Sequence, residues 1–99
     1  MSSPTEINEI IAAVRSGDHG AEERLIAATY SQLVALAERI MSRHGQTATD
    51  LQPTTLVHET WLQMLGKGTP LVDHAHVFAL ASSIMRLTLL NFSRTRAVE

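Results

Sequence analysis

Residues Leu51–Leu65 read LQPTTLVHETWLQML, and this stretch decides the fold class. Pro53 suits the first position of a helix, because its φ is already helical and its missing N–H needs no partner there. At 100° per residue, one side of the predicted helix is apolar and is flanked by Leu56 and Leu65. Its members are Val57, Thr60, Trp61 and Met64. The stretch is therefore predicted to be an amphipathic helix with one face in a core.

The opposite face of this helix is polar and carries one leucine. It consists of Thr55, His58, Glu59, Leu62 and Gln63. Single exposed leucines are common on protein surfaces and by themselves need no explanation. The alternative is a surface that docks another helix, with Leu62 as its central apolar contact and polar residues around it. The pattern alone leaves both interpretations open.

Three more helices are predicted around this segment, and each has apolar residues at helical spacing. Their ranges are about 5–15, about 21–44, and from 73 or 74 to about 95. The first two stripes are Ile7, Ile10, Ile11 and Val14, then Leu25, Ile26, Thr29, Tyr30, Leu33, Leu36, Ala37, Ile40 and Met41. Pro4 stands just before the first helix, and Gly17 and Gly20 bracket the turn after it.

The connecting segments are polar and short, and no strand pattern or internal repeat is present. Residues 45–50 form one predicted loop, and a break at Gly66–Gly68 with a loop at 69–73 separates the last two helices. An all-α bundle of about four helices follows. Its last helix is expected to carry an apolar patch, in which Leu89 and Leu90 flank a polar strip. The strip consists of Ser82, Arg86 and Ser93.

Composition limits the class of protein. The 99 residues are enough for one small domain, and no cysteine is present. No apolar run reaches the roughly 20 residues of a membrane span, and the start lacks the basic region of a signal peptide. We therefore expect a cytoplasmic protein that does not bind a membrane. A formal charge of −2 argues against binding nucleic acid mainly by bulk electrostatics.

No catalytic or metal-binding motif is complete. His58 and Glu59 begin like a zinc-protease HExxH motif, but Leu62 takes the place of the second histidine. His74 and His76 would point about 200° apart on a helix, which is poor chelating geometry. Trp61, Phe78, Met85 and Phe92 are predicted to be core residues and not a base-stacking set. We expect no enzyme activity, no metal and no cofactor.

Two separated motifs resemble a known family. Leu56–Leu62, LVHETWL, resembles the polymerase-binding helix in region 2 of bacterial extracytoplasmic-function (ECF) sigma factors of the sigma-70 family. The LQPT opening at 51–54, the AHVFALA segment at 75–81 and the Met85–Arg86 pair resemble an ECF-like subgroup with an LQPT-x-LVHE motif. The resemblance covers about residues 22–96.

The resemblance implies a fold and a domain organisation. Residues 1–99 would form a single sigma region 2 domain, with an N-terminal helix in 1–18 and the core of region 2 in 21–96. The C-terminal helix-turn-helix domain of typical members would be absent from this chain. Its function would be to bind core RNA polymerase and to open promoter DNA at the minus-ten element.

The resemblance also assigns roles to particular residues. The residues facing the clamp helices of the polymerase β′ subunit would be Gln52, Thr54, Thr55, His58, Glu59 and Leu62. The residues lying against the minus-ten element would be Lys67, Asp73, His74 and His76. Backbone phosphates would be contacted by Arg86, Arg94 and Arg96.

The sequence departs from the family pattern in two places. The acidic start of the family's polymerase-binding helix is replaced here by Gln52–Thr55. The last helix of this chain also has fewer basic residues than the same helix in the family. Phosphorylation of Thr54 or Thr55 by a Ser/Thr kinase would restore the missing negative charge. Ordinary helix-start chemistry explains the same threonines without a kinase. An anti-sigma factor is another candidate regulator, and a helical adaptor that binds polymerase without recognising DNA is the alternative function.

Overall fold

The structure is a computed structural model that describes residues 3–43, 51–66, 68 and 70–98, with side chains up to residue 92. Within these residues the chain forms helices α1 (Pro4–Arg15), α2 (Ala21–Arg43), α3 (Pro53–Gly66) and α4 (His74–Val98), and no strand. The prediction of an all-α bundle of about four helices is confirmed. The dimensions are 44 × 26 × 18 Å.

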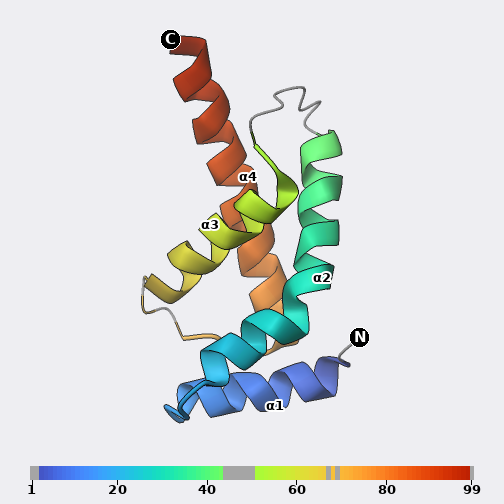
Figure 1. Cartoon of the computed structure of the whole chain (residues 1–99), viewed down its shortest axis with the longest axis vertical. Helices are drawn as coiled ribbons and strands as arrows, with labels where there is room; N and C mark the ends of the chain where they lie inside the picture. The colour runs from blue at the N-terminus through green and yellow to red at the C-terminus, as the bar shows by residue number, and fades with distance from the viewer. Residues whose placement is uncertain (1–2, 44–50, 67, 69, 99) are drawn as a thin grey trace.

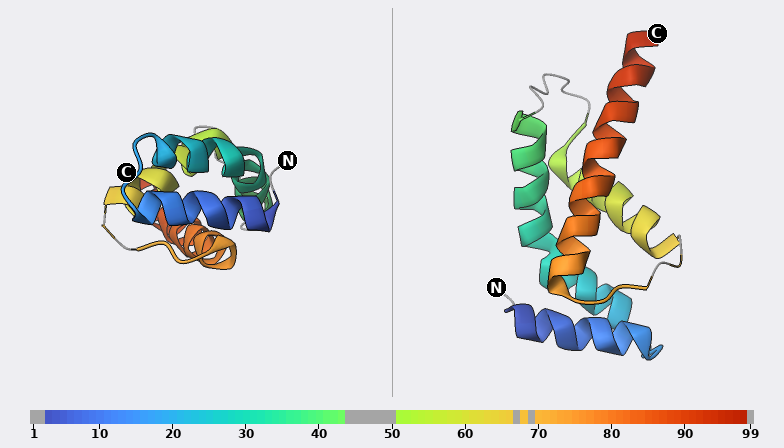
Figure 2. Two further views of the ribbon diagram at one scale, coloured as in Figure 1. Left: turned by 90° about the horizontal axis from the view of Figure 1, so that it is seen from below. Right: turned by 180° about the vertical axis from the view of Figure 1, so that it is seen from behind.

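The helices divide the molecule into a base and an upright part. Helix α1 lies across one end, while α2 and α4 run lengthwise in the same direction and α3 crosses them obliquely (Figure 1). The last turns of α4 extend beyond the other helices at the end opposite α1 (Figure 2). This arrangement leaves one side of α3 facing outward and places α2 and α4 side by side.

Helix α2 bends in its first half, so that its early turns follow α1 and its later turns follow α4 (Figures 1 and 2). The buried Thr29 lies in this part of the helix, and its hydroxyl donates to the Leu25 carbonyl at 2.8 Å. Such bonds from a threonine hydroxyl to the preceding turn are a recognised cause of helix bending. One helix thereby serves both parts of the fold.

Local signals account for most helix boundaries. Helix α1 begins at Pro4, one residue earlier than predicted, because Ser3 is the cap: its hydroxyl accepts the Glu6 N–H and Glu6 accepts the Ser3 N–H in return. Gly17 and Gly20 both have φ of +80°, as the predicted turn requires. Helix α3 begins at Pro53 as expected.

The later boundaries differ slightly from the prediction. Helix α4 continues to Val98, three residues beyond the predicted end. Helix α2 ends at Arg43, and the predicted loop at 45–50 lies outside the described residues, as does His44. Gly68, in the break after α3, has φ of +65°, which favours glycine.

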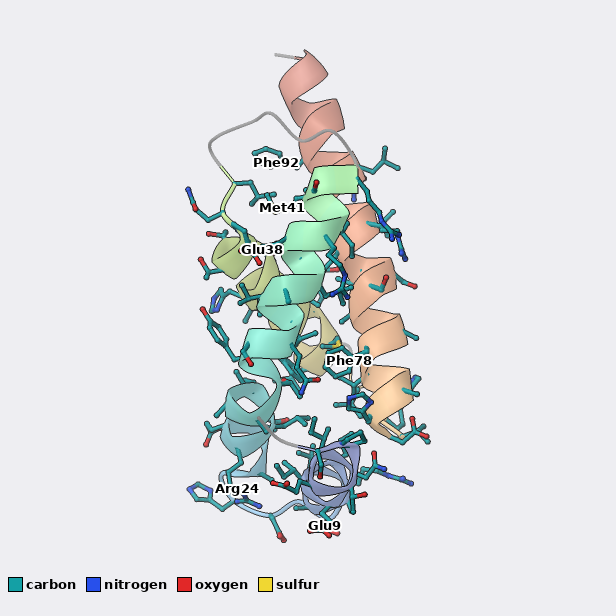
Figure 3. All side chains as sticks on the ribbon, turned by 90° about the vertical axis from the view of Figure 1, so that its right-hand side faces the viewer. Glu9, Arg24, Glu38, Met41, Phe78 and Phe92 are labelled. Carbon is teal, nitrogen blue, oxygen red and sulfur yellow. The ribbon has the colours of Figure 1, made fainter. Side chains whose placement is uncertain are left out.

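The core is formed by all four helices. Its fully buried large side chains include Ile7, Ile11, Leu25, Leu33, Leu56, Val57, Met64, Val77 and Met85. Trp61 is also buried, while Phe78 and Phe92 are half-buried and pack against the core. Figure 3 shows Phe78 between α2 and α4, and Phe92 near the far end of α2. The prediction that these aromatic residues belong to the core is confirmed.

Two predicted placements of apolar residues are wrong. Tyr30 was placed in the apolar stripe of α2, but it is 44% exposed because it lies at the edge of that stripe. Leu89 was expected in a surface patch, but it is only 2% exposed because it faces the core. The exposed leucines of this part of α4 are Leu87 and Leu90, which are three residues apart.

Helix α4 contains a stretch, His74–Phe92, that is long and apolar enough to cross a bilayer by length and composition alone. The core helix of a water-soluble bundle meets the same criterion, and part of this stretch packs in the core of the present fold. The stretch therefore does not by itself indicate a membrane span.

Candidate functional site

The outward side of α3 matches the surface predicted from its sequence. Thr55, His58, Glu59 and Leu62 are exposed, and we call these four residues the outer α3 surface. Leu62 is 54% exposed, whereas the residues on the opposite side of α3 are buried. The structure therefore brings one large apolar side chain and three polar ones together on a single helix face.

The start of α3 carries neutral polar residues at a positive helix end. Gln52, Thr54 and Thr55 are exposed, and the first turn contains no acidic residue. The Gln52 carbonyl accepts the Leu56 N–H at 3.1 Å and so begins the hydrogen bonds of the helix. Because the N-terminus of a helix carries partial positive charge, a negative group here would be stabilised.

A hydrogen bond to α4 holds the outer α3 surface in orientation. Gln63 was predicted on the polar face, yet it is half-buried, and its Nε2 donates to Thr88 Oγ1 at 3.2 Å. Inside the helix, the buried Thr60 hydroxyl donates to the Leu56 carbonyl at 2.7 Å. The polar side chains on the inner and lateral sides of α3 thus serve the fold, while the residues of the outer α3 surface are exposed.

A small notch borders the outer α3 surface where α2 meets α3. It encloses about 250 Å³ and is lined by Ile26, Tyr30, Thr54, Val57, His58 and Trp61. The Trp61 Nε1 atom is buried and has no hydrogen-bond partner among the described residues. Because Tyr30 belongs to α2 and is exposed beside residues of α3 in this notch, it extends the exposed surface from α3 onto α2. Periodicity misplaced this residue, although the polar hydroxyl of tyrosine was a signal of partial exposure.

The start of α4 is a network of local hydrogen bonds. Asp73 caps the helix, because its Oδ1 accepts the His76 N–H at 2.8 Å. The Val72 N–H donates to His76 Nδ1 at 3.1 Å, and the His74 N–H donates to Asn8 Oδ1 at 2.7 Å. Asp73, His74 and His76, which were predicted to contact DNA, thus also take part in local structure, and the bond that the His74 N–H donates to Asn8 links α4 to α1.

Replacing Asn8 by alanine is expected to lower the free energy of unfolding by about 0.5–1.5 kcal/mol, the usual contribution of one hydrogen bond. The His74 N–H would lose its partner, but water can reach this exposed site. Chemical denaturation measures the change. Glu9→Ala is the matched control, because Glu9 is an exposed neighbour on α1 that forms no such bond with any residue the structure describes. Equal stability of the two variants would show that the Asn8 contact does not fix α4.

The structure describes only one of the four basic side chains that were predicted to contact DNA. Arg86 is exposed on α4. Lys67 and the side chains of Arg94 and Arg96 lie outside the described residues, so their predicted DNA contacts stay predictions. Within the part of the chain that the structure describes, no group of three His, Cys, Asp or Glu residues lies close enough to hold a metal ion.

One of three comparisons with known proteins gave a match. A family model described as "ECF sigma factor" matches residues 4–99, nearly the whole chain. The searches of curated proteins and of solved structures returned no match.

Proposed function

Because this chain belongs to the ECF sigma factor family, we propose that it docks on core RNA polymerase through the outer α3 surface and recognises the promoter minus-ten element. The family is one of sigma factors, which act with core polymerase and promoter DNA and are not a known class of enzyme. The assignment of residues to the two partners is the proposal.

The exposed Leu62 supports the polymerase part more than any other observation. It is 54% exposed in the middle of a polar face, whereas the five buried residues of α3 hold the helix on the core. A large apolar side chain inside a polar rim is the usual anatomy of a helix-docking site. Thr55, His58 and Glu59 supply the rim, and the clamp helices of β′ are the proposed partner.

The DNA part of the proposal concerns the segment before α4 and the first turn of that helix. Asp73 is exposed and His74 and His76 are half-buried, so all three remain accessible although Asp73 also caps the helix. Capture of an unstacked base depends on shape and hydrogen bonds more than on a large positive charge. The formal charge of −2 is compatible with this mode when polymerase supplies further contacts.

The proposed function predicts that the complex of this chain with core polymerase binds a single-stranded minus-ten oligonucleotide in a sequence-dependent way. Replacing one preferred base is expected to reduce affinity about 5- to 150-fold, which corresponds to the roughly 1–3 kcal/mol of one mismatched position. Fluorescence anisotropy with a panel of substituted oligonucleotides measures this. Polymerase binding without any sequence preference would instead support a helical adaptor that has lost promoter recognition.

A second part of the proposal is regulation by phosphorylation at the start of α3. Thr54 and Thr55 are exposed at the positive end of a helix whose first turn has no carboxylate. A phosphate there adds about −1.5 to −2 charges and is stabilised by the helix dipole. A Ser/Thr kinase would thereby supply the acidic start that the family pattern has and this chain lacks.

We expect the phosphorylated chain and the double variant Thr54→Glu/Thr55→Glu to bind core polymerase about 3- to 10-fold more tightly than the unmodified chain. The gain corresponds to one or two charge interactions of partly exposed groups. Affinities are measured by biolayer interferometry at two salt concentrations. The neutral variant Thr54→Gln/Thr55→Gln is the control, and equal binding by all forms would end the switch hypothesis.

A further inference from the structure

A groove lies at the base of the molecule, where the end of α3 is near the turn between α1 and α2 (Figures 1 and 2). Its first part encloses about 330 Å³, and its lining includes Val14, Glu22, Met64, Leu65, Pro70 and Leu71. Its second part also encloses about 330 Å³, and its lining includes Val14, Asp18, His19, Glu22 and Glu23. Because Val14 and Glu22 line both parts, the two are continuous, and we call them together the base groove.

The first part of the base groove is apolar. Met64 and Leu71 are buried and form its floor, and Val14 and Leu65 are half-buried beside them. Pro70 is exposed at its edge. A hollow of about 330 Å³ lies at the lower end of the sizes of ligand sites, so it has room for one large apolar side chain of a partner.

The second part of the base groove is negatively charged. Asp18, Glu22 and Glu23 are exposed, and their carboxylates form no hydrogen bond or ion pair with any residue that the structure describes. Arg15 is the one cation among the described lining residues, so the local charge is −2 (three negative, one positive) with His19 neutral. The start of α2 stabilises carboxylates in its first turn, which accounts for Glu22 and Glu23 but not for the open apolar surface beside them.

This combination of charge and apolar surface selects the kind of partner. Three carboxylates would repel the phosphates of DNA and the headgroups of anionic lipids, so neither suits the groove. Nor do three His, Cys, Asp or Glu side chains lie close enough to hold a metal ion within the described residues. The groove instead fits positive charge next to an apolar group, a pairing that a basic peptide segment supplies.

We propose that the base groove binds a basic segment of a protein partner, in which one large apolar side chain stands close to lysine or arginine residues. The apolar side chain packs on the floor of the first part, between Val14 and Leu65. The cations lie along the carboxylates of the second part, where each pair with an exposed partner contributes modestly and is weakened by salt.

A partner in the base groove would also affect the start of α4. Pro70 and Leu71 line the groove and directly precede Val72, Asp73 and His74. A bound segment would therefore cover the residues proposed to lie against the minus-ten element and would compete with promoter DNA. This consequence rests on the proposed function, whereas binding of the segment itself does not.

The test begins with the free full chain and a random peptide library displayed on phage. We expect the selected peptides to share a large apolar residue within a few positions of two or more lysines or arginines. Fluorescence anisotropy with synthetic copies of these peptides measures their affinity. Replacing the apolar residue of a peptide by serine is expected to weaken binding about 10-fold, since the burial of one large side chain is lost.

Two double variants locate the binding site on the chain. Glu22→Gln/Glu23→Gln removes two charges of the base groove and is expected to weaken peptide binding about 5-fold at low salt, with a smaller difference at high salt. Glu9→Gln/Glu38→Gln is the matched control, because it removes the same charge from exposed residues that do not line the groove. Figure 3 shows Glu9 on α1 and Glu38 on the later turns of α2. The control is expected to change affinity less than about 2-fold, and circular dichroism confirms that both variants are folded.

Competition with DNA is measured on the chain bound to core polymerase and a fluorescent single-stranded minus-ten oligonucleotide. We expect the selected peptides to release the oligonucleotide from the wild type. The groove variant should need about 5-fold more peptide for the same release, because its affinity for the peptide is lower by that factor.

Two results would overturn the inference. The first is selection of peptides that lack basic residues, and the second is equal peptide binding by the groove variant and the Glu9/Glu38 control. Peptide binding in the groove without release of DNA would support the protein contact and refute the competition. A wild type that binds no minus-ten oligonucleotide would count against promoter recognition itself, while peptide binding by the free chain would still support the groove.

Discussion

Replacing Glu59 and Leu62 together by alanine is expected to weaken binding to core RNA polymerase at least about 30-fold, with the fold unchanged. The factor corresponds to about 2 kcal/mol, the threshold of a binding hot spot. Leu62 supplies the apolar contact of the outer α3 surface, and Glu59 lies beside it on the same exposed face. Because both side chains point away from the core, their loss should change the free energy of unfolding by less than about 0.5 kcal/mol.

The matched control is Leu87→Ala/Leu90→Ala on α4. These leucines are 56% and 52% exposed, close to the 54% of Leu62, so the control removes more apolar surface than the Glu59/Leu62 variant, at another place on the molecule. We expect it to retain wild-type affinity for polymerase in biolayer interferometry. If the two double variants bind equally well, the outer α3 surface is not the docking site and the proposed assignment of residues fails. If only the control loses affinity, polymerase contacts α4 instead.

The sequence predicted α3 well because its two faces differ sharply in composition. Every residue placed on its inner face is buried or half-buried, and four of the five on its outer face are exposed. The exception, Gln63, bonds Thr88 across 25 positions of sequence, a contact that periodicity within one helix cannot predict. The same limit explains Asn8, which meets His74 only because α1 lies across the start of α4.

The errors on α2 and α4 arose where apolar residues fill more than one face. Leu87, Leu89 and Leu90 lie so close in sequence that spacing does not decide which one is buried. The fold selects Leu89, because that side of α4 faces the core. Tyr30 was misplaced for a related reason. The apolar stripe predicted for α2 covers more of the helix circumference than the face that packs against the neighbouring helices, and Tyr30 lies at its exposed edge.

The candidate sites were predictable to different degrees. The outer α3 surface follows from one helix and was therefore found from spacing and from the family motif. The hollow that Phe78 lines together with α2 residues such as Ala35 and Arg39 joins positions about 40 apart in the sequence, which spacing within one helix does not predict. Asp73 was predicted only as a contact with DNA, although an aspartate before a helix also suits the capping role that the structure shows.

Replacing Leu56 by alanine is expected to have the largest effect on stability. Leu56 is fully buried between α3 and the rest of the core, and such a truncation costs about 2–5 kcal/mol through lost burial and the cavity left behind. A domain of this size has a free energy of unfolding of about 5–15 kcal/mol, so a large part of it would be removed. Urea denaturation with an unchanged m-value measures the loss.

Leu62→Ala provides the contrast, six residues further along the same helix. It deletes the same atoms from a side chain that is 54% exposed, so its effect on unfolding should stay below about 0.5 kcal/mol. Loss of polymerase binding by the Leu56 variant would then follow from unfolding and be restored at lower temperature, whereas the loss at Leu62 would persist in a folded chain. A Leu62 variant as unstable as the Leu56 variant would mean that Leu62 stabilises the bundle, and the outer α3 surface would have no apolar residue to offer a partner.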